Sequence, residues 1–270
     1  MAEKLIIAGS AKDATMAKTG SNVYLAGGTE VMRLGSSVKS KAFVSVRKAK
    51  DMHKISATKT RFTFGAACTF QELLDCDKTP DYLKEALLFM ASRTRRNMAT
   101  VAGNIVLRRD DSFMIPTLIA VGAELALINK KGEESKVSVC DYVFDKKKYK
   151  DLLITKIAVP ADGVAVKSVR NTNTAQSHAR LTAALSLKKG KYTAIVAVKN
   201  SGLYVLDDLA ALMNKEAKLS EDDIVEFIKS KKDIKLKDDL LYGGADYRRY
   251  LIGITFALMY KELNGKGGRA

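Results

Sequence analysis

The stretch Arg95–Leu127 reads RRNMATVAGNIVLRRDDSFMIPTLIAVGAELAL, and it decides the fold that we predict for this chain. Within it, Thr100–Asn104 (TVAGN) has small residues that leave backbone N–H groups uncovered, flanked by two polar side chains. Because bare backbone donors can approach an oxyanion closely, this segment is predicted to be an anion-binding turn. A charged link, an apolar helix-like run and a strand at Ala123–Ile128 are predicted to follow.

A second small-residue turn lies further upstream. Val23–Leu25 is predicted to be a strand, Ala26–Glu30 (AGGTE) a turn, and Val31–Leu34 the start of a helix. A strand that feeds a Gly-Gly turn at a helix start can cradle a phosphate. Taken alone, a glycine pair after a strand is more often an ordinary tight turn. The chain has no G-x-G-x-x-G, which excludes an ordinary Rossmann fingerprint.

Together the two turns resemble the FAD-binding medium subunits of molybdenum hydroxylases, such as the flavoprotein subunits of xanthine dehydrogenase and aerobic carbon monoxide dehydrogenase. In that family an A-G-G-T/H-D/E/S loop and a T-x-G-G-N loop hold the diphosphate of FAD. The likeness continues through R-N-x-x-T-x-x-G-N, a helix with Pro116, Gly122–Leu125 (GAEL) and Asp246–Leu251 near the C-terminus, and so covers nearly the whole chain. Within the family, the chain is most similar to a small bacterial subgroup described as selenate reductase FAD-binding subunits.

The resemblance implies a set of FAD-binding residues. The two loops supply most of them, a residue at the end of an upstream helix lies near the flavin, and one in the closing strand touches the cofactor. No catalytic residue and no metal ligand is predicted. The predicted FAD-binding residues are Leu25, Ala26, Gly27, Gly28, Thr29, Glu30, Val31, Met90, Thr100, Val101, Ala102, Gly103, Asn104, Asp111, Ser112, Leu153 and Lys167.

Three features depart from the family pattern. Ala102 replaces the first glycine of G-G-N, which fits only if that residue has φ below zero. The acidic residue near the FAD ribose is displaced, so either flavin binding is weaker or Asp110, Asp111 or Ser112 serves instead. The family's K-x-x-S-R-R segment matches KSVRNTNT (residues 167–174) poorly, and Lys167 or Arg170 is expected to supply positive charge near the cofactor.

Three arginines precede the second turn, namely Arg93, Arg95 and Arg96. Either they are surface charges, or one of them pairs with a phosphate of the cofactor.

The implied fold is α+β. An FAD-binding domain of the PCMH type, as in vanillyl-alcohol oxidase, is expected at residues 1–162, with subdomains at about 1–55 and 56–162. A smaller α+β C-terminal domain, a sheet packed with helices, is expected at residues 163–270. The loop at Ala161–Gly163 is predicted to be the boundary.

Local signals predict several further elements. Ser10 is predicted to cap a helix, and Thr69 with Glu72 to form a capping box. Lys188–Lys191 is predicted to be a hairpin turn between two apolar strands. Ala245–Leu263 is predicted to be a long amphipathic helix whose apolar face is core or a subunit contact.

The composition indicates a cytoplasmic protein with a substantial core. Hydrophobic residues make up 47% of the chain, and no run approaches the roughly 18 apolar residues of a membrane helix. Met1–Ala8 lacks the apolar core of a signal peptide. The three cysteines (Cys68, Cys76 and Cys140) are too few and too scattered for an iron–sulfur motif or a zinc site, so any iron–sulfur cluster is expected on another chain.

The formal net charge of +16 raises the question of nucleic acid binding. The lysines are dispersed, and the densest run, Lys146–Lys150, lies between predicted elements. We therefore interpret most of the charge as a solvated surface and do not expect nucleic acid binding. The alternative is a basic face that docks an acidic subunit or attracts anionic dinucleotides.

The function implied by the resemblance is electron transfer. The chain would bind one FAD non-covalently, receive electrons from an iron–sulfur subunit and pass them to an acceptor such as NAD. Its partners would be the iron–sulfur and molybdopterin-binding subunits of the same complex, with no membrane. One alternative is a stand-alone FAD-dependent reductase of the same fold, against which the family-like segment Arg248–Tyr250 argues. The other is a basic binding protein that has lost FAD, supported by Ala102 and KSVRNTNT.

Overall fold

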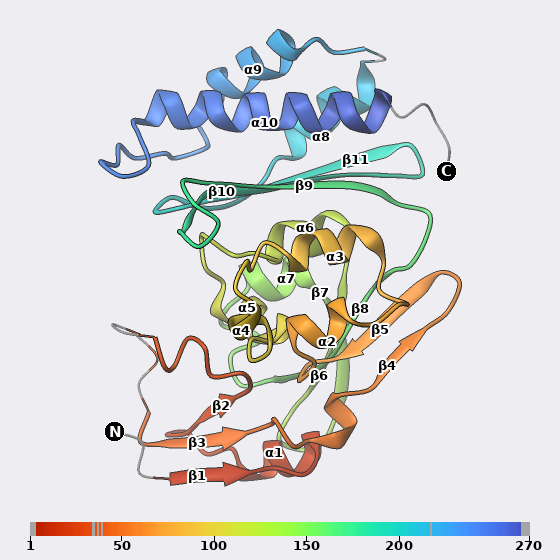
Figure 1. Cartoon of the computed structure of the whole chain (residues 1–270), viewed down its shortest axis with the longest axis vertical. Helices are drawn as coiled ribbons and strands as arrows, with labels where there is room; N and C mark the ends of the chain where they lie inside the picture. Colours follow the sequence, from red (N-terminus) through yellow and green to blue (C-terminus); the bar gives the residue numbers. More distant parts are fainter. Residues whose placement is uncertain (1–3, 34–35, 37, 39, 217, 266–270) are drawn as a thin grey trace. The chain divides into compact units, whose positions relative to one another are not determined.

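The structure is a computed structural model that describes residues 4–33, 36, 38, 40–216 and 218–265. It has an α+β fold whose residues form two compact units, each assembled from several stretches of chain (Figure 1). The chain enters the second unit twice before it stays there from Asp162 onward. Unit 1 comprises Met1–Pro80, Met90–Leu107 and Gly122–Ala161, and unit 2 comprises Asp81–Phe89, Arg108–Val121 and Asp162–Ala270.

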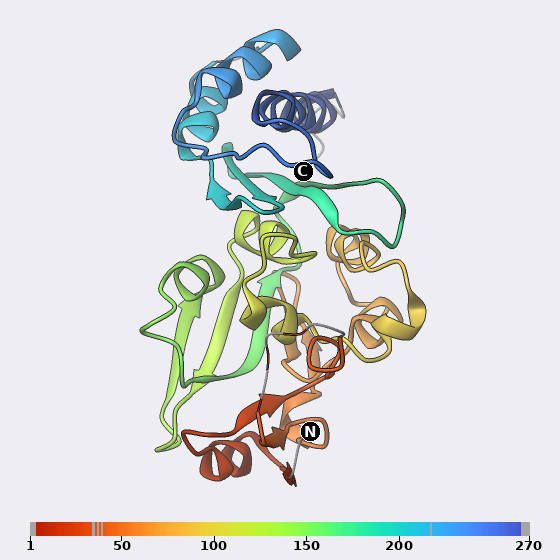
Figure 2. The same cartoon turned by 90° about the vertical axis from the view of Figure 1, so that its left-hand side faces the viewer.

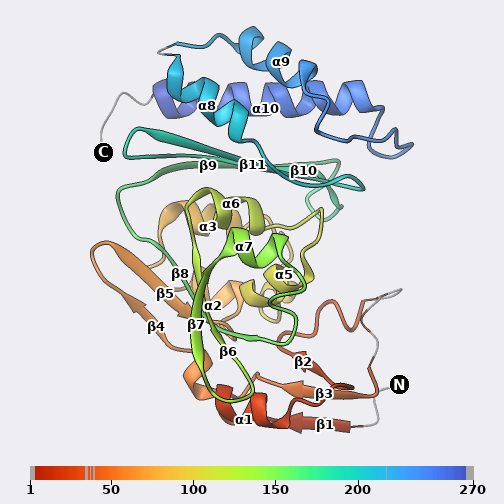
Figure 3. The same cartoon turned by 180° about the vertical axis from the view of Figure 1, so that it is seen from behind.

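The described residues of unit 1 form two sheets. The first is parallel, has the order β1-β3-β2, and consists of β1 (Lys4–Ile7), β2 (Val23–Leu25) and β3 (Ala42–Ser45). The second is antiparallel and has the order β4-β5-β8-β6-β7 (Figure 3). Its strands are β4 (Ile55–Ala57), β5 (Arg61–Gly65), β6 (Glu124–Ile128), β7 (Glu134–Ser138) and β8 (Leu153–Pro160).

Short helices connect the strands of unit 1. The predicted cap of α1 (Ala11–Ala17) is confirmed, because the N–H of Asp13 donates to Ser10 Oγ over 3.1 Å. This helix contacts both sheets through β3, β6 and β8. The predicted capping box of Thr69 and Glu72 is also confirmed, at the start of α2. The remaining helices are η1 (Lys50–Met52), α2 (Phe70–Leu74), α4 (Arg93–Arg96), α5 (Val101–Leu107) and α7 (Val139–Phe144).

Unit 2 is a four-stranded antiparallel sheet, order β12-β11-β10-β9, with helices on both faces (Figures 1 and 2). The predicted hairpin is confirmed: Lys189 and Gly190 have φ of 50° and 74°, the signs that a type I′ turn requires. The strands are β9 (Ala165–Thr172), β10 (Ala179–Lys188), β11 (Lys191–Val198) and β12 (Gly202–Val205). The helices are α3 (Asp81–Leu87), α6 (Ile115–Ala120), α8 (Asp207–Lys215), α9 (Glu221–Ser230) and α10 (Ala245–Gly265).

Strand β10 is buried on both faces, which explains its almost unbroken run of small and apolar residues. Leu185 belongs to the core cluster that it shares with Ile252 and Phe256 of α10. On the opposite face, the hydroxyl of Ser186 donates to the carbonyl of Ala120 at the end of α6. Alternate residues of one strand therefore connect two helix layers.

Helices α9 and α10 pack closely where Gly253 faces α9. A Cβ atom added at Gly253 would lie 2.9 Å from the Cα of Val225. The predicted long C-terminal helix is confirmed, and its glycine sets the distance between the two helices.

We predict that Gly253→Val lowers the free energy of unfolding by about 2 kcal/mol, because the added methyl groups must displace backbone rather than a flexible side chain. Urea unfolding would measure the change. Gly265→Ala is the control on the same helix, since a Cβ there meets no atom within 4 Å. Equal losses for the two variants would contradict the prediction.

Candidate functional site

The two predicted FAD-binding segments touch within unit 1. A Cβ atom added at Gly27 would lie 1.8 Å from the carbonyl oxygen of Met98 and 3.1 Å from the Cα of Ala99. Both of these atoms belong to backbone, so no side chain fits at position 27. The loop after β2 is therefore held directly against the chain that leads into Thr100.

The loop continues as a series of turns. Gly28 has φ of 71°, a value that favours glycine. The N–H of Met32 donates to Gly28 O, but the next bond runs from the N–H of Arg33 to Glu30 O, and Met32 is 80% exposed. The helix predicted from Val31 is therefore wrong over residues 31–33, which form turns whose apolar Met32 side chain points to solvent instead of packing against the core. Leu34 lies outside the described residues.

The second segment is the first turn of a helix. Thr100 precedes α5, and its Oγ1 accepts from the N–H of Gly103 over 3.0 Å, while its carbonyl accepts from the N–H of Asn104. The predicted turn at Thr100–Asn104 is wrong, because Val101 and Ile105, spaced four residues apart, bury one helical face completely.

Ala102 fits this helical backbone. It lies within α5, its φ is negative, and 6% of its surface is exposed. The negative φ that an alanine requires at this position is therefore present.

Three further residues of interest also belong to unit 1. Met90 and Leu153 are both buried. The guanidinium of Arg96 donates to the carbonyls of Met90 and Ala91, each over 2.7 Å, and so holds the turn before α4. Arg93 and Arg95 are exposed on α4.

Asp111 is the centre of a charged cluster in unit 2. This residue is 6% exposed, and its carboxylate accepts two hydrogen bonds from Arg109, the shorter one 2.7 Å long. His178 Nδ1 lies 2.6 Å and Lys199 Nζ 3.1 Å from its other oxygen. Burial raises the pKa of Asp111, but the hydrogen bonds and positive charges of Arg109 and Lys199 outweigh burial and hold that pKa well below its usual range.

The other predicted site residues of unit 2 also make contacts inside that unit. Ser112 Oγ accepts from the N–H of Ile115 over 3.1 Å at the start of α6. Lys167 pairs with Glu262 over 2.8 Å, and the guanidinium of Arg170 lies 5.0 Å from the centre of the Phe113 ring.

The predicted set is thus divided between the units. Leu25–Val31, Met90, Thr100–Asn104 and Leu153 belong to unit 1, and Asp111, Ser112 and Lys167 belong to unit 2. The structure brings together the two loops, and the roles of all these residues toward FAD stay predictions.

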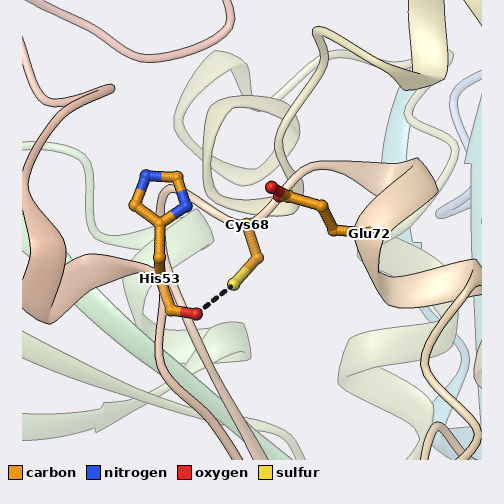
Figure 4. Close-up of side chains that lie close together, drawn as sticks. All are labelled: His53, Cys68 and Glu72. Atoms are coloured by element: carbon orange, nitrogen blue, oxygen red, sulfur yellow. Dashed lines mark hydrogen bonds between the residues drawn. The ribbon is translucent and has the colours of Figure 1, made fainter.

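Sequence reasoning did not find a group of potential metal ligands in unit 1. The side chains of His53, Cys68 and Glu72 gather at one place (Figure 4). The only sequence signal was the capping box that fixes Glu72 one turn after Cys68, and nothing in the sequence placed His53 beside it.

Gly27→Ala is predicted to lower the free energy of unfolding by about 2 kcal/mol or more, because its methyl group would overlap the Met98 carbonyl and push the two segments apart. Urea unfolding followed by circular dichroism would measure this. Gly20→Ala is the control, since a Cβ at that position has no neighbour within 4 Å. An unchanged midpoint for Gly27→Ala would refute the contact.

Asp111→Asn is predicted to lower stability at neutral pH by at least about 2 kcal/mol, because it removes the buried negative charge on which Arg109 and Lys199 converge, although Lys199 keeps Asp110 at 3.3 Å. A carboxyl with a lowered pKa stabilises the fold above its unfolded value of about 3.9 and loses that effect as the pH falls toward its folded pKa. The difference from wild type should therefore be full at pH 7 and shrink below about pH 4. Unfolding curves across this range would test it, with the exposed Asp233→Asn as control.

Comparison with known proteins gives a family match. Residues 3–162 match the family described as the FAD binding domain in molybdopterin dehydrogenase. Over 250 residues the chain is 25% identical to the uncharacterized protein YgfM of Escherichia coli K12. The aligned region covers 92% of this chain and 90% of YgfM.

Solved structures confirm the predicted fold. Quinoline 2-oxidoreductase from Pseudomonas putida 86 superposes with a TM-score of 0.83 at 15% identity, covering 97% of this chain and 96% of that chain. Carbon monoxide dehydrogenase from Hydrogenophaga pseudoflava, in a form lacking the Mo-pyranopterin moiety, gives a TM-score of 0.82 at 16% identity, with the same coverage. At these identities the likeness concerns the fold alone.

Proposed function

Because the chain belongs to the family of FAD-binding domains in molybdopterin dehydrogenases, we propose that it carries electrons from an iron–sulfur subunit through FAD to an acceptor such as NAD. FAD is the cofactor of this family, and the chain is a flavoprotein component of a molybdenum hydroxylase-type oxidoreductase. The finer assignments, namely the acceptor, the partners and a xanthine dehydrogenase-like activity, are parts of the proposal.

The observation that carries the proposal is the contact of Gly27 with Met98 and Ala99. It brings the loop after β2 and the start of α5 together, as a shared grip on one diphosphate requires. Gly28 adds no bulk to the loop, and the nearest atom to an added Cβ there is Leu25 Cδ1 at 3.6 Å. These two observations support the proposal that both segments hold one diphosphate.

The protein's own part is to bind and orient. We propose that the backbone of Ala26–Thr29 and of Thr100–Gly103 holds the diphosphate, and that Met90 and Leu153 lie against the apolar part of the cofactor. When bound, FAD supplies the redox chemistry, since it accepts electrons singly and releases them in pairs. No protein nucleophile or general base is needed for this role.

Iron–sulfur and molybdopterin-binding subunits are the proposed partners, in a cytoplasmic complex. Among the described residues, no helix is both long and apolar enough to cross a membrane. The alternative of a binding protein without FAD loses one of its two supports, because Ala102 adopts a helical φ that alanine accommodates.

The purified chain is predicted to bind FAD in a one-to-one ratio, and Gly28→Val and Gly103→Val are each predicted to abolish binding by filling the space that the diphosphate needs. Visible absorption and fluorescence titration would measure it. Gly132→Val is the matched control for Gly28→Val, since Gly132 also has positive φ, 83°, and an added Cβ there has no neighbour within 4 Å.

Equal FAD affinity in wild type, Gly28→Val and Gly132→Val would contradict the predicted cradle. Anaerobic mixing of the FAD-loaded chain with NADH tests the acceptor. Bleaching of the flavin band supports NAD, and an unchanged band directs the search to another acceptor.

A further inference from the structure

His53, Cys68 and Glu72 form a compact group of metal-ligand side chains in unit 1 (Figure 4). One ligand atom from each side chain lies within 4.8 Å of those of the other two. In a tetrahedral zinc site, ligand atoms are separated by about 3.4 to 3.6 Å, so side-chain rotations that shift these atoms by about 1 Å would close the group around an ion.

The backbone beneath these side chains is firmly held. A Cβ added at Gly65 would lie 2.0 Å from the carbonyl oxygen of Met52, which packs β5 directly against the residue before His53. The N–H of Ala67 donates to the same carbonyl over 2.9 Å, and the N–H of Cys68 donates to Gly65 O. His53 and Cys68 are therefore positioned relative to each other by backbone contacts.

Glu72 is positioned by the capping box of α2. One carboxylate oxygen, Oε2, accepts from the N–H of Thr69 over 2.7 Å, and Thr69 Oγ1 accepts from the N–H of Glu72 over 3.1 Å. This arrangement fixes the side chain one helical turn from Cys68 and assigns only one of its two oxygens to the cap.

The contact of His53 with a carbonyl favours the tautomer that a metal ligand needs. Its Nε2 lies 2.9 Å from the carbonyl oxygen of Arg47. A carbonyl can only accept, so in the neutral imidazole Nε2 carries the proton and Nδ1 presents its lone pair. Histidine ligands in metal sites commonly donate their second ring N–H to a backbone carbonyl in this way, which sets the ring orientation.

From this geometry we propose that His53 Nδ1, Cys68 Sγ and Glu72 form a binding site for Zn²⁺. A thiolate, an imidazole and a carboxylate are a ligand set typical of zinc, and three protein ligands leave the fourth position to water or to an added ligand. Cys68 is 2% exposed, whereas Glu72 is exposed and His53 partly so, which opens the site on the solvent side.

Binding changes one hydrogen bond. In the metal-free chain, the Cys68 thiol donates to His53 O over 3.4 Å. On binding, a Zn–S bond replaces the S–H bond, the thiol proton passes to solvent, and no oxidation or reduction takes place. Thr69, which lies between Cys68 and Glu72, pairs with Thr100 of the proposed FAD cradle. None of the three zinc ligands is a predicted FAD-binding residue, and the zinc test uses the FAD-free chain, so it can fail or succeed separately from the test of the proposed function.

The experiment uses the full chain without a histidine tag, stripped of metal with EDTA and kept reduced. On titration with Co²⁺, a thiolate-to-metal charge-transfer band is predicted to appear and to saturate at one equivalent of Co²⁺. One equivalent of Zn²⁺ is predicted to remove the band. Zn²⁺ affinity would be measured by competition with a chromophoric chelator. Loss of an outer-shell partner typically costs 10- to 100-fold in metal affinity, so Cys68→Ser should weaken binding by at least about 100-fold.

Two matched controls come from the chain itself. Cys76→Ser and His178→Gln should keep wild-type affinity, while Cys68→Ser and His53→Gln should lose it; His53 and His178 are the only two histidines. Glu72→Gln preserves the capping box and removes only the charge, so it should weaken zinc binding without loss of helix content. Absence of the charge-transfer band in wild type, or equal Zn²⁺ affinity in wild type and Glu72→Gln, would overturn the proposal, even if Cys68→Ser failed to fold.

Discussion

The contact of Gly27 with the Met98–Ala99 backbone is the constraint on which the candidate cofactor site depends. Two backbone segments approach so closely that even a methyl group is excluded, so the loop after β2 and the entry to α5 behave as one element. Such a contact relies on sterics rather than charge, and its geometry changes little with pH or ionic strength. This property suits a binding site for a charged cofactor, since the positions of the two segments do not change with the charge of the bound group.

Unit 2 is organised differently, around a buried carboxylate. Asp111 connects the segment before α6 to the ends of two strands, because His178, just before β10, and Lys199, just after β11, both contact its carboxylate, while Arg109 of its own segment also donates to it. Ser186 and Ala120 add a second polar link between β10 and α6. Directional polar contacts of this kind fix which helix lies on which face of a sheet, a choice that burial of apolar area alone leaves open.

Local sequence signals predicted the helix caps and the hairpin turn correctly, since these features depend on interactions between residues that are close in sequence. Ser10, Thr69 and the turn at Lys189–Gly190 act as their types predict. The errors fell on the two cofactor loops. Small residues at 102 and 103 suggested a turn, yet burial of Val101 and Ile105 makes a helix there. The predicted contacts with FAD rest on the resemblance to the family. The contact of Gly27 with Met98 and the approach of His53 to Cys68 join residues that are distant in sequence, and no local sequence pattern predicts such contacts.

The interleaving of the two units has a consequence for how such a chain can be divided. The family match ends at residue 162, yet the stretch up to that point includes Asp81–Phe89 and Arg108–Val121, which fold with the sheet of unit 2. All six residues of α6 are buried in this structure, and a gene truncated after residue 162 would encode that helix without the strands that cover it. Chimaeras of two relatives that are joined after residue 162 should therefore seldom fold, because α6 would come from one parent and the strands that cover it from the other.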